Sequence, residues 1–189
     1  MTRFFMGTAD VQLAAERLAR KFEELGIPYA ICGGLAVFVH GHERMTKDVD
    51  VLVTAEGLRR FRENALGLGW LERFPGSRGV RDTDKNVPID LLVSGGYPGD
   101  GTPRGVAFPD PATCAERKNG KQYVSLPKLI ELKLACGLSS PDRPRDFDDV
   151  IQLVRANALP ESFVHCLHPE VQPKFRELWG YAQRPIGEY

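Results

Sequence analysis

The sequence lacks an excess of charge of either sign. Its 189 residues contain 25 Lys and Arg against 25 Asp and Glu, so the formal net charge at pH 7 is zero. Proteins that bind nucleic acid through their overall electrostatic field carry a clear excess of basic residues. The charge balance therefore excludes a global attraction to nucleic acid and leaves only a local basic patch as an option.

Long apolar runs and paired cysteines are also missing. No stretch approaches the roughly 20 apolar residues that cross a bilayer, and the N-terminal MTRFFMGTADV has too short an apolar run for a secretory signal. The cysteines at positions 32, 114, 136 and 166 include no CxxC pair, so we expect no disulfide framework. These absences predict a soluble, cytoplasmic protein with reduced thiols and no membrane partner.

What is present is an ordinary globular composition, with 42% hydrophobic and 26% charged residues. Strand patterns dominate the first two thirds of the chain and helical patterns the last third. This order predicts an α+β (mixed α/β) fold. We expect a core over residues 1–126 and a C-terminal helical extension, packed on that core, over residues 127–189.

Hydrophobic periodicity locates the individual elements. Asp10 is a candidate N-cap for the first helix, Gly26 its stop and Thr54 the cap of a later helix. The dipeptide Asn119-Gly120 predicts a hairpin turn. The expected strands cover residues 29–32, 48–53, 68–73 and 89–93, and the expected helices cover 10–25, 35–40 and 55–65, then 129–135, 147–154 and one or two within 160–182, with a loop at 94–105.

Three acidic residues indicate a metal-binding site. Asp48 and Asp50 stand at i and i+2 of a predicted strand, so their side chains share one face. Such close like charges need a compensating cation, and Mg²⁺ with oxygen ligands is the natural one. Asp90 lies on a second predicted strand, in PIDLLV, with Ile89 and Leu91 on the opposite face. If the strands are neighbours, Asp90 can reach the same cation or accept a proton.

A glycine pair and two basic residues precede the acids. Gly33 and Gly34 lie between a strand and a short helix, where the backbone can approach phosphate oxygens. Arg44 and Lys47 could neutralise a triphosphate. Each feature has a plainer explanation when taken alone, because Asp-x-Asp pairs are common on solvated strands and a Gly-Gly is often only a turn. The ordered set favours a site.

The segment ICGGLAVFVHGHERMTKDVDVLV, followed by PIDLLV, resembles the nucleotidyltransferase superfamily related to DNA polymerase β. Within that superfamily it resembles the AbiEii/AbiGii toxin-like branch. The resemblance implies that Gly33 and Gly34 open the nucleotide loop and that Asp48, Asp50 and Asp90 hold divalent metal, Mg²⁺ or Mn²⁺. The branch's Arg-x-Thr-x-Asp run matches Arg44-Met45-Thr46-Lys47-Asp48, which assigns Arg44, Thr46 and Lys47 to nucleotide binding.

The resemblance also covers the C-terminal helical part, where the sequence match is weaker. Lys133 matches a catalytic lysine, and Asp146 matches the acid of a following Lys/Arg-Asp run. One departure stands out, because Gly34-Leu35-Ala36 offers no hydroxyl where many active members have a serine. Lys133 itself has two interpretations, a structural ion pair with Asp146 or Asp149 and a phosphate contact oriented by Asp146.

The implied activity is transfer of an NMP from an NTP to an acceptor hydroxyl. The acceptor stays open among RNA such as tRNA, a protein and a small molecule. A non-catalytic nucleotide- or RNA-binding module on the same fold is the alternative, favoured by the missing serine. A cognate antitoxin is a further partner that the resemblance implies.

Overall fold

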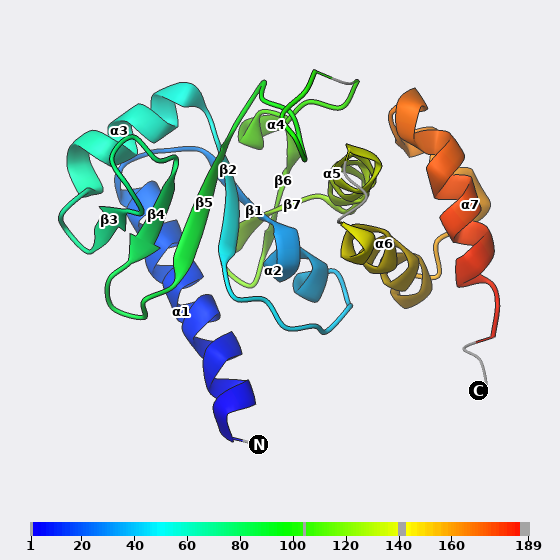
Figure 1. The fold of residues 1–189 in the computed structure, drawn as a ribbon, viewed down its shortest axis with the longest axis horizontal. Helices are drawn as coiled ribbons and strands as arrows, with labels where there is room; N and C mark the ends of the chain where they lie inside the picture. Colours follow the sequence, from blue (N-terminus) through cyan, green and yellow to red (C-terminus); the bar gives the residue numbers. More distant parts are fainter. Residues whose placement is uncertain (1, 104, 140–142, 186–189) are drawn as a thin grey trace.

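A computed structural model describes residues 2–103, 105–139 and 143–185, with the side chains of residues 2–8 excepted. The described strands form one mixed sheet of seven, in the spatial order β3-β4-β5-β2-β1-β7-β6 (Figure 1). Their bounds are β1 (Tyr29–Cys32), β2 (Val49–Val53), β3 (Trp70–Glu72), β4 (Gly79–Asp82), β5 (Pro88–Val93), β6 (Ala115–Lys118) and β7 (Lys121–Val124). The chain thus has the mixed α/β fold that its pattern predicts.

Helices cover both faces of the sheet unequally (Figure 1). The helices, with two 3₁₀ segments, are α1 (Thr2–Glu24), α2 (Gly33–Val39), α3 (Ala55–Ala65), α4 (Pro111–Cys114), α5 (Leu126–Ser139), α6 (Pro144–Ala156), η1 (Glu161–Cys166), η2 (Pro169–Val171) and α7 (Gln172–Ala182). The C-terminal helices α5, α6 and α7 stand together beside the sheet, and α6 lies between α5 and α7.

The main core fills the space between the sheet and the pair α1 and α3. Its centre is an aromatic cluster in which the Phe22 ring lies 5.3 Å from both Tyr29 and Phe61, and Phe61 lies 5.7 Å from Trp70. Offset and tilted rings at these separations add to the burial of their apolar area. This core covers one face of the sheet, and α2 packs on the other, which is the more open face.

Local signals predicted several boundaries well. The predicted helix at 55–65 is α3, and the Thr54 hydroxyl accepts a hydrogen bond from Gly57 N at 2.9 Å, as expected of its N-cap. Asn119 and Gly120 both have positive φ and join β6 to β7, so the predicted hairpin is confirmed. Gly26, with φ of 60°, follows the end of α1.

Other predictions placed the ends of helices and strands at the wrong residues. Asp10 is not an N-cap, because α1 already begins at Thr2 and Asp10 lies inside it. Asp48 precedes β2, which begins at Val49, and Gly33 and Gly34 are the first two residues of α2. The short elements β4 and α4 were not predicted, since four residues carry too little periodicity. No helix in the described part is long and apolar enough to cross a membrane.

Candidate functional site

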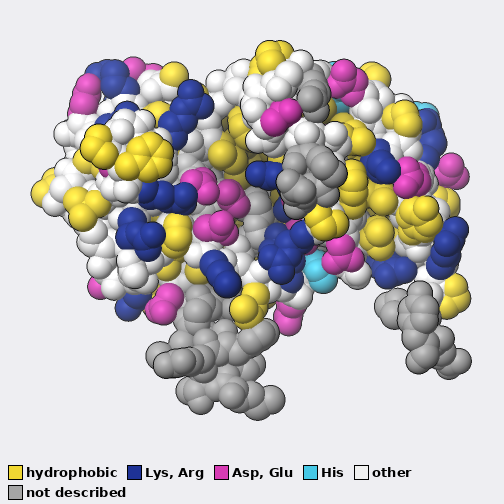
Figure 2. Space-filling view, viewed as in Figure 1, with side chains coloured by type: hydrophobic (Ala, Val, Ile, Leu, Met, Phe, Trp, Pro, Cys, Tyr) yellow, Lys and Arg dark blue, Asp and Glu magenta, His cyan; other side chains and the backbone are white. Residues whose placement is uncertain are grey.

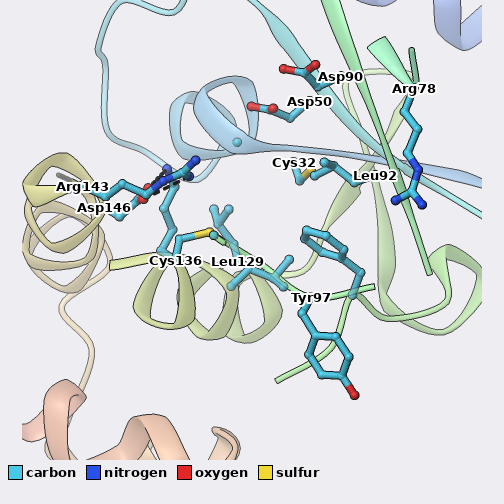
Figure 3. A pocket seen from close by; sticks show the side chains of 15 residues that line it. Cys32, Asp50, Arg78, Asp90, Leu92, Tyr97, Leu129, Cys136, Arg143 and Asp146 are labelled. Atoms are coloured by element: carbon cyan, nitrogen blue, oxygen red, sulfur yellow. Dashed lines mark hydrogen bonds and ion pairs between the residues drawn. The ribbon is translucent and has the colours of Figure 1, made fainter. Parts of the chain in front are cut away.

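Two of the three acids lie side by side on the open face. Strands β2 and β5 are parallel neighbours, and Asp50 is the register partner of Asp90. Figure 3 shows the two carboxylates pointing the same way. On β5, Ile89 and Leu91 are buried, as predicted from their alternation with Asp90. The sheet therefore brings together two acids that are far apart in the chain.

The third acid stands at the entry to β2. The Asp48 carboxylate accepts a hydrogen bond from the Thr46 hydroxyl at 2.9 Å, and Thr46 itself is buried. Thr46 therefore orients Asp48, which is a role the sequence did not suggest for it. Within the described residues, no group of three or more His, Cys, Asp or Glu side chains is arranged to hold a metal ion.

Asp50 has an unusual electrostatic position. Among the described residues its carboxylate makes no hydrogen bond and no ion pair. Burial, followed by the charges of Asp48 and Asp90, raises the pKa of Asp50 to about 7, although Lys133 acts in the opposite direction. Asp90 differs, because Arg73 pairs with it at 2.9 Å. A carboxylate held without a partner beside two others is a strong candidate ligand for a cation.

The glycine pair has a steric role at this site. Gly33 has a φ of 58°, and a Cβ at this position would lie 1.8 Å from Asp50 Oδ2. A Cβ on Gly34 would lie 2.6 Å from the Thr46 hydroxyl. Glycine is thus required for α2 to pack against the acids and against the threonine that orients Asp48. The predicted contact of Gly33 and Gly34 with a nucleotide stays a prediction.

This close approach makes a prediction for Gly33→Ala. We expect a loss of unfolding free energy from two sources, about 1–2 kcal/mol for the left-handed backbone and about 1–3 kcal/mol for the collision with Asp50. Gly26→Ala is the matched control, since Gly26 has a φ of 60° and open space around a Cβ. Urea titration of both variants should show the larger loss for Gly33→Ala, and equal losses would contradict the steric role.

Lys133 lies across from the acids in a buried ionic network. Its ammonium pairs with Asp146 at 2.7 Å and with Asp149 at 2.7 Å, and the Asp149 carboxylate also accepts from the Arg44 guanidinium at 2.6 and 2.9 Å. Burial lowers the pKa of Lys133, but the two carboxylates outweigh it and leave that pKa raised. The network joins the loop before β2 to α5 and α6.

Asp50, Asp90 and Lys133 line one cavity of about 360 Å³ between the open sheet face and α5, whereas Asp48 lies outside its lining. Figure 2 shows acidic side chains at the edge of a hollow, with basic side chains on both sides. In Figure 3, Arg143 and Asp146 lie on one side of the acid pair and Arg78 on the other. The rest of the lining includes an apolar wall formed by Leu92, Tyr97, Phe108, Leu129 and Leu132.

The predicted basic residues fall in different places. Arg44 is held by Asp149 and lies outside the cavity lining, and Lys47 is exposed with no ion pair among the described residues. Sequence reasoning did not single out Arg73, Arg78 or Tyr97. Neither Arg73 nor Arg78 belongs to a recognisable sequence motif. Both precede β4, and the register of β4 against β5 brings them close to Asp90.

Comparisons with known proteins follow the geometry. No protein-family model and no curated protein matches the sequence. Among solved structures, the solution structure of the antibiotic-resistance factor ANT(2'')-Ia is similar, with a TM-score of 0.57, 16% identity, and coverage of 93% of this chain and 95% of that one. The crystal structure of ANT(2'')-Ia in complex with adenylyl-2''-tobramycin gives a TM-score of 0.55, 16% identity, and coverage of 90% and 98%. The protein therefore shares the mixed α/β fold of ANT(2'')-Ia.

Proposed function

We propose that this protein is a nucleotidyltransferase that moves an NMP from an NTP to an acceptor hydroxyl. The observation that carries the proposal is the pair Asp50 and Asp90, side by side in a cavity, with Asp50 left without a hydrogen bond or ion pair among the described residues. Adjacent carboxylates of this kind require positive charge, and a metal–nucleotide complex supplies it.

Asp50, Asp90 and Asp48 would hold the divalent cation, Mg²⁺ or Mn²⁺. The pair Asp50 and Asp90 fits a hard cation, because both offer oxygen ligands side by side and the Asp50 carboxylate has no competing partner among the described residues. Asp48 would join them only when the ion binds, since the described structure gathers no three such side chains around one point. When bound, such an ion polarises the α-phosphate and offsets its developing charge.

The protein's own groups supply the remaining chemistry. The acceptor hydroxyl attacks the α-phosphorus, the bond from that phosphorus to the bridging oxygen breaks, and pyrophosphate leaves. The hydroxyl proton passes to water, because Arg73 holds one Asp90 oxygen and the other is assigned to the cation. Lys133 lies on the side of the cavity where the leaving pyrophosphate would gather, and its ammonium would stabilise that charge. Asp146 and Asp149 fix the direction of the ammonium.

Calorimetric titration of the four NTPs with and without Mg²⁺ tests the proposal. We expect one or more NTPs to bind only when Mg²⁺ is present, and pyrophosphate to appear once an acceptor is added. Binding without pyrophosphate release under any acceptor would favour the non-catalytic nucleotide- or RNA-binding module, which the missing hydroxyl around Gly34-Leu35-Ala36 supports. An absence of NTP binding in both conditions would reject nucleotidyl transfer and nucleotide binding alike.

Lys133→Met is expected to weaken NTP binding about tenfold or more, because it deletes a charge-assisted phosphate contact. Lys128→Met is the matched control on the same helix, since Lys128 pairs with Glu131 at 2.6 Å and does not line the cavity. Calorimetry of both variants with Mg²⁺ and NTP measures the difference. A lower melting temperature for Lys133→Met with unchanged NTP affinity would make its ion pairs purely structural.

The acceptor and the biological partner are less constrained. An RNA acceptor such as tRNA and a cognate antitoxin rest on the resemblance to the toxin-like branch. A small-molecule acceptor has support from ANT(2'')-Ia, whose structure was solved with adenylyl-2''-tobramycin. RNA is an anionic acceptor and tobramycin a cationic one. The charged side chains around Asp90 therefore help to distinguish between these two classes of acceptor.

A further inference from the structure

Arg78 is a basic side chain that lines the cavity with no hydrogen bond or ion pair to the described residues. The other basic groups of the lining are engaged, Lys133 with Asp146 and Asp149 and Arg143 with Asp146 at 3.9 Å. A guanidinium presents a planar set of donors suited to phosphate or carboxylate. Arg78 is therefore available to a ligand.

The backbone around Arg78 is fixed although its side chain is unpaired. The carbonyl of Ser77 accepts a hydrogen bond from Arg62 at 2.7 Å, and the Ser77 hydroxyl accepts one from Gly79 N at 3.0 Å. Gly79 is also the register partner of Asp90 on the neighbouring strand. Arg78 thus projects from an anchored point, which lowers the entropy cost of holding a ligand.

Asp90 does not need Arg78 as its counter-ion, because Arg73 fills that role. Gly79 makes this possible, since a Cβ there would lie 3.0 Å from Arg73 Nε and 3.1 Å from Asp90 Oδ1. Arg73 consequently pairs with Asp90 from outside the cavity lining, and Arg78 lines the cavity with no partner among the described residues. An anion entering near Asp90 meets Arg78.

The cavity offers little to a cationic acceptor. Its acidic lining residues are Asp50, Asp90 and Asp146. The first two are assigned to the metal, and Asp146 is already paired with Lys133. An ammonium group would find no unassigned carboxylate among these lining residues and would face the charge of Arg78. Burying a charge without a partner is costly.

The two ends of the cavity differ in position as well as in charge. Arg143 and Asp146, the partner of Lys133, lie on one side of the acid pair, and Arg78 lies on the other (Figure 3). If the triphosphate lies along the Lys133 side, the acceptor must approach from the Arg78 side, next to Asp90. Arg78 is then placed to contact the acceptor and not the leaving pyrophosphate.

We propose that Arg78 selects the acceptor, binding an anionic group, a phosphate or a carboxylate, that the acceptor carries near its reacting hydroxyl. Polycationic acceptors such as aminoglycosides are disfavoured. This inference rests on the proposed nucleotidyl transfer, and it adds the charge class of the second substrate. It sets this cavity apart from the chemistry implied by tobramycin, a polyamine, on the similar fold of ANT(2'')-Ia.

The test uses the full chain saturated with Mg²⁺ and an α,β-methylene NTP analogue. If the analogue does not bind, the proposed function fails before the acceptor is examined. If it binds, calorimetric titrations follow with glucose, glucose 6-phosphate, glucuronate and tobramycin. We expect at least one of the two anionic sugars to bind about tenfold or more tightly than glucose, with tobramycin not saturating. The stronger of the two anions identifies phosphate or carboxylate as the recognised group.

Substitutions assign the effect to the residue. Arg78→Gln should reduce the affinity for the anionic sugar about tenfold or more and change that for the analogue less than about twofold, whereas Arg78→Lys should retain most of it. Arg81→Gln is the control, because Arg81 is bonded to Asn86 and is not in the cavity lining. The proposal is overturned if glucose binds as well as both anionic sugars, if tobramycin binds more tightly, or if Arg78→Gln weakens only the analogue.

Discussion

Asp50→Asn is expected to abolish Mg²⁺-dependent NTP binding and, in metal-free buffer, to stabilise the protein at neutral and alkaline pH. The Asp50 carboxylate lies near two others and has no partner among the described residues, and its pKa is raised to about 7. Asparagine keeps nearly the same shape and removes the charge. The variant should therefore fold as well as the parent or better while lacking the metal ligand.

The pH dependence follows from the sign of this pKa change. The folded protein binds a proton at Asp50 more tightly than the unfolded chain, whose Asp pKa is about 3.9. Stability contributed by the protonated form is present at low pH and is lost as the pH rises from about 4 to about 8. Since one pKa unit is worth about 1.4 kcal/mol, the loss is on the order of 2–4 kcal/mol.

Urea unfolding of parent and Asp50→Asn across this pH range, with EDTA present, measures the effect. The two curves should agree near pH 4 and separate progressively above it, with the variant more stable. Adding Mg²⁺ should raise the stability of the parent and narrow the gap. Asp84→Asn is the control, because Asp84 is exposed and its ion pairs with Arg17 and Lys85 are both long, at 3.6 Å. Parallel curves for parent and Asp50→Asn would contradict the placement of Asp50.

The second large effect is expected at Asp149. Its carboxylate has no exposed surface and binds both the Arg44 guanidinium and the Lys133 ammonium. Asp149→Ala leaves these two cations without their shared partner and opens a space between α5 and α6. Breaking a buried ion pair by removing one member costs about 3–5 kcal/mol. We expect a loss in that range, which is a large part of the stability of a typical domain.

Asp148→Ala supplies a matched control one residue away. Asp148 is exposed on the same helix, and its side chain accepts only a weak hydrogen bond from Gln152 at 3.3 Å. Its removal should change the unfolding free energy by no more than about 0.5 kcal/mol. Chemical denaturation measures the unfolding free energy of both variants. Equal losses for Asp148→Ala and Asp149→Ala would mean that Asp149 does not hold the ionic network together.

A double-mutant cycle between Arg44 and Asp149 adds a test of coupling. The two side chains form two hydrogen bonds across 105 residues of sequence. Residues in direct contact show interaction energies of about 0.5–3 kcal/mol in such cycles. Because Thr46 and Asp48 follow Arg44 on the same loop, a coupling of this size would also mean that Asp149 positions the entry to β2.

Much of the fold follows from local patterns in the sequence. On β5, the alternation of Ile89 and Leu91 with Asp90 determines which side chains face the core and which face the cavity. The cap at Thr54 and the turn at Asn119-Gly120 are fixed by the chemistry of a few adjacent residues. Such signals are local, so they can be found without knowing where any strand lies in the sheet.

The sequence also predicted that Asp48 and Asp50 stand close together on one strand, but Asp48 lies just before β2, and the Thr46 hydroxyl orients it. The sequence could not determine that Asp90 would be the register partner of Asp50, since periodicity defines the faces of a strand and not its neighbours. The resemblance to a known superfamily implied only that Asp90 belongs to the same site, and the parallel pairing of β2 with β5 places it beside Asp50.

Tertiary structure alone determined two features, the ionic network of Arg44, Lys133 and Asp149 and the end of the cavity that Arg78 lines. Whether Arg44 meets a phosphate or a carboxylate depends on where α6 packs, and Asp149 reaches it there. Arg78 owes its place in the cavity to the pairing of β4 with β5, two strands that antiparallel hydrogen bonds align. Charges distant in sequence are brought together only when helices and strands pack, so the pairing of charges in this cavity is a property of the fold and not of any local motif.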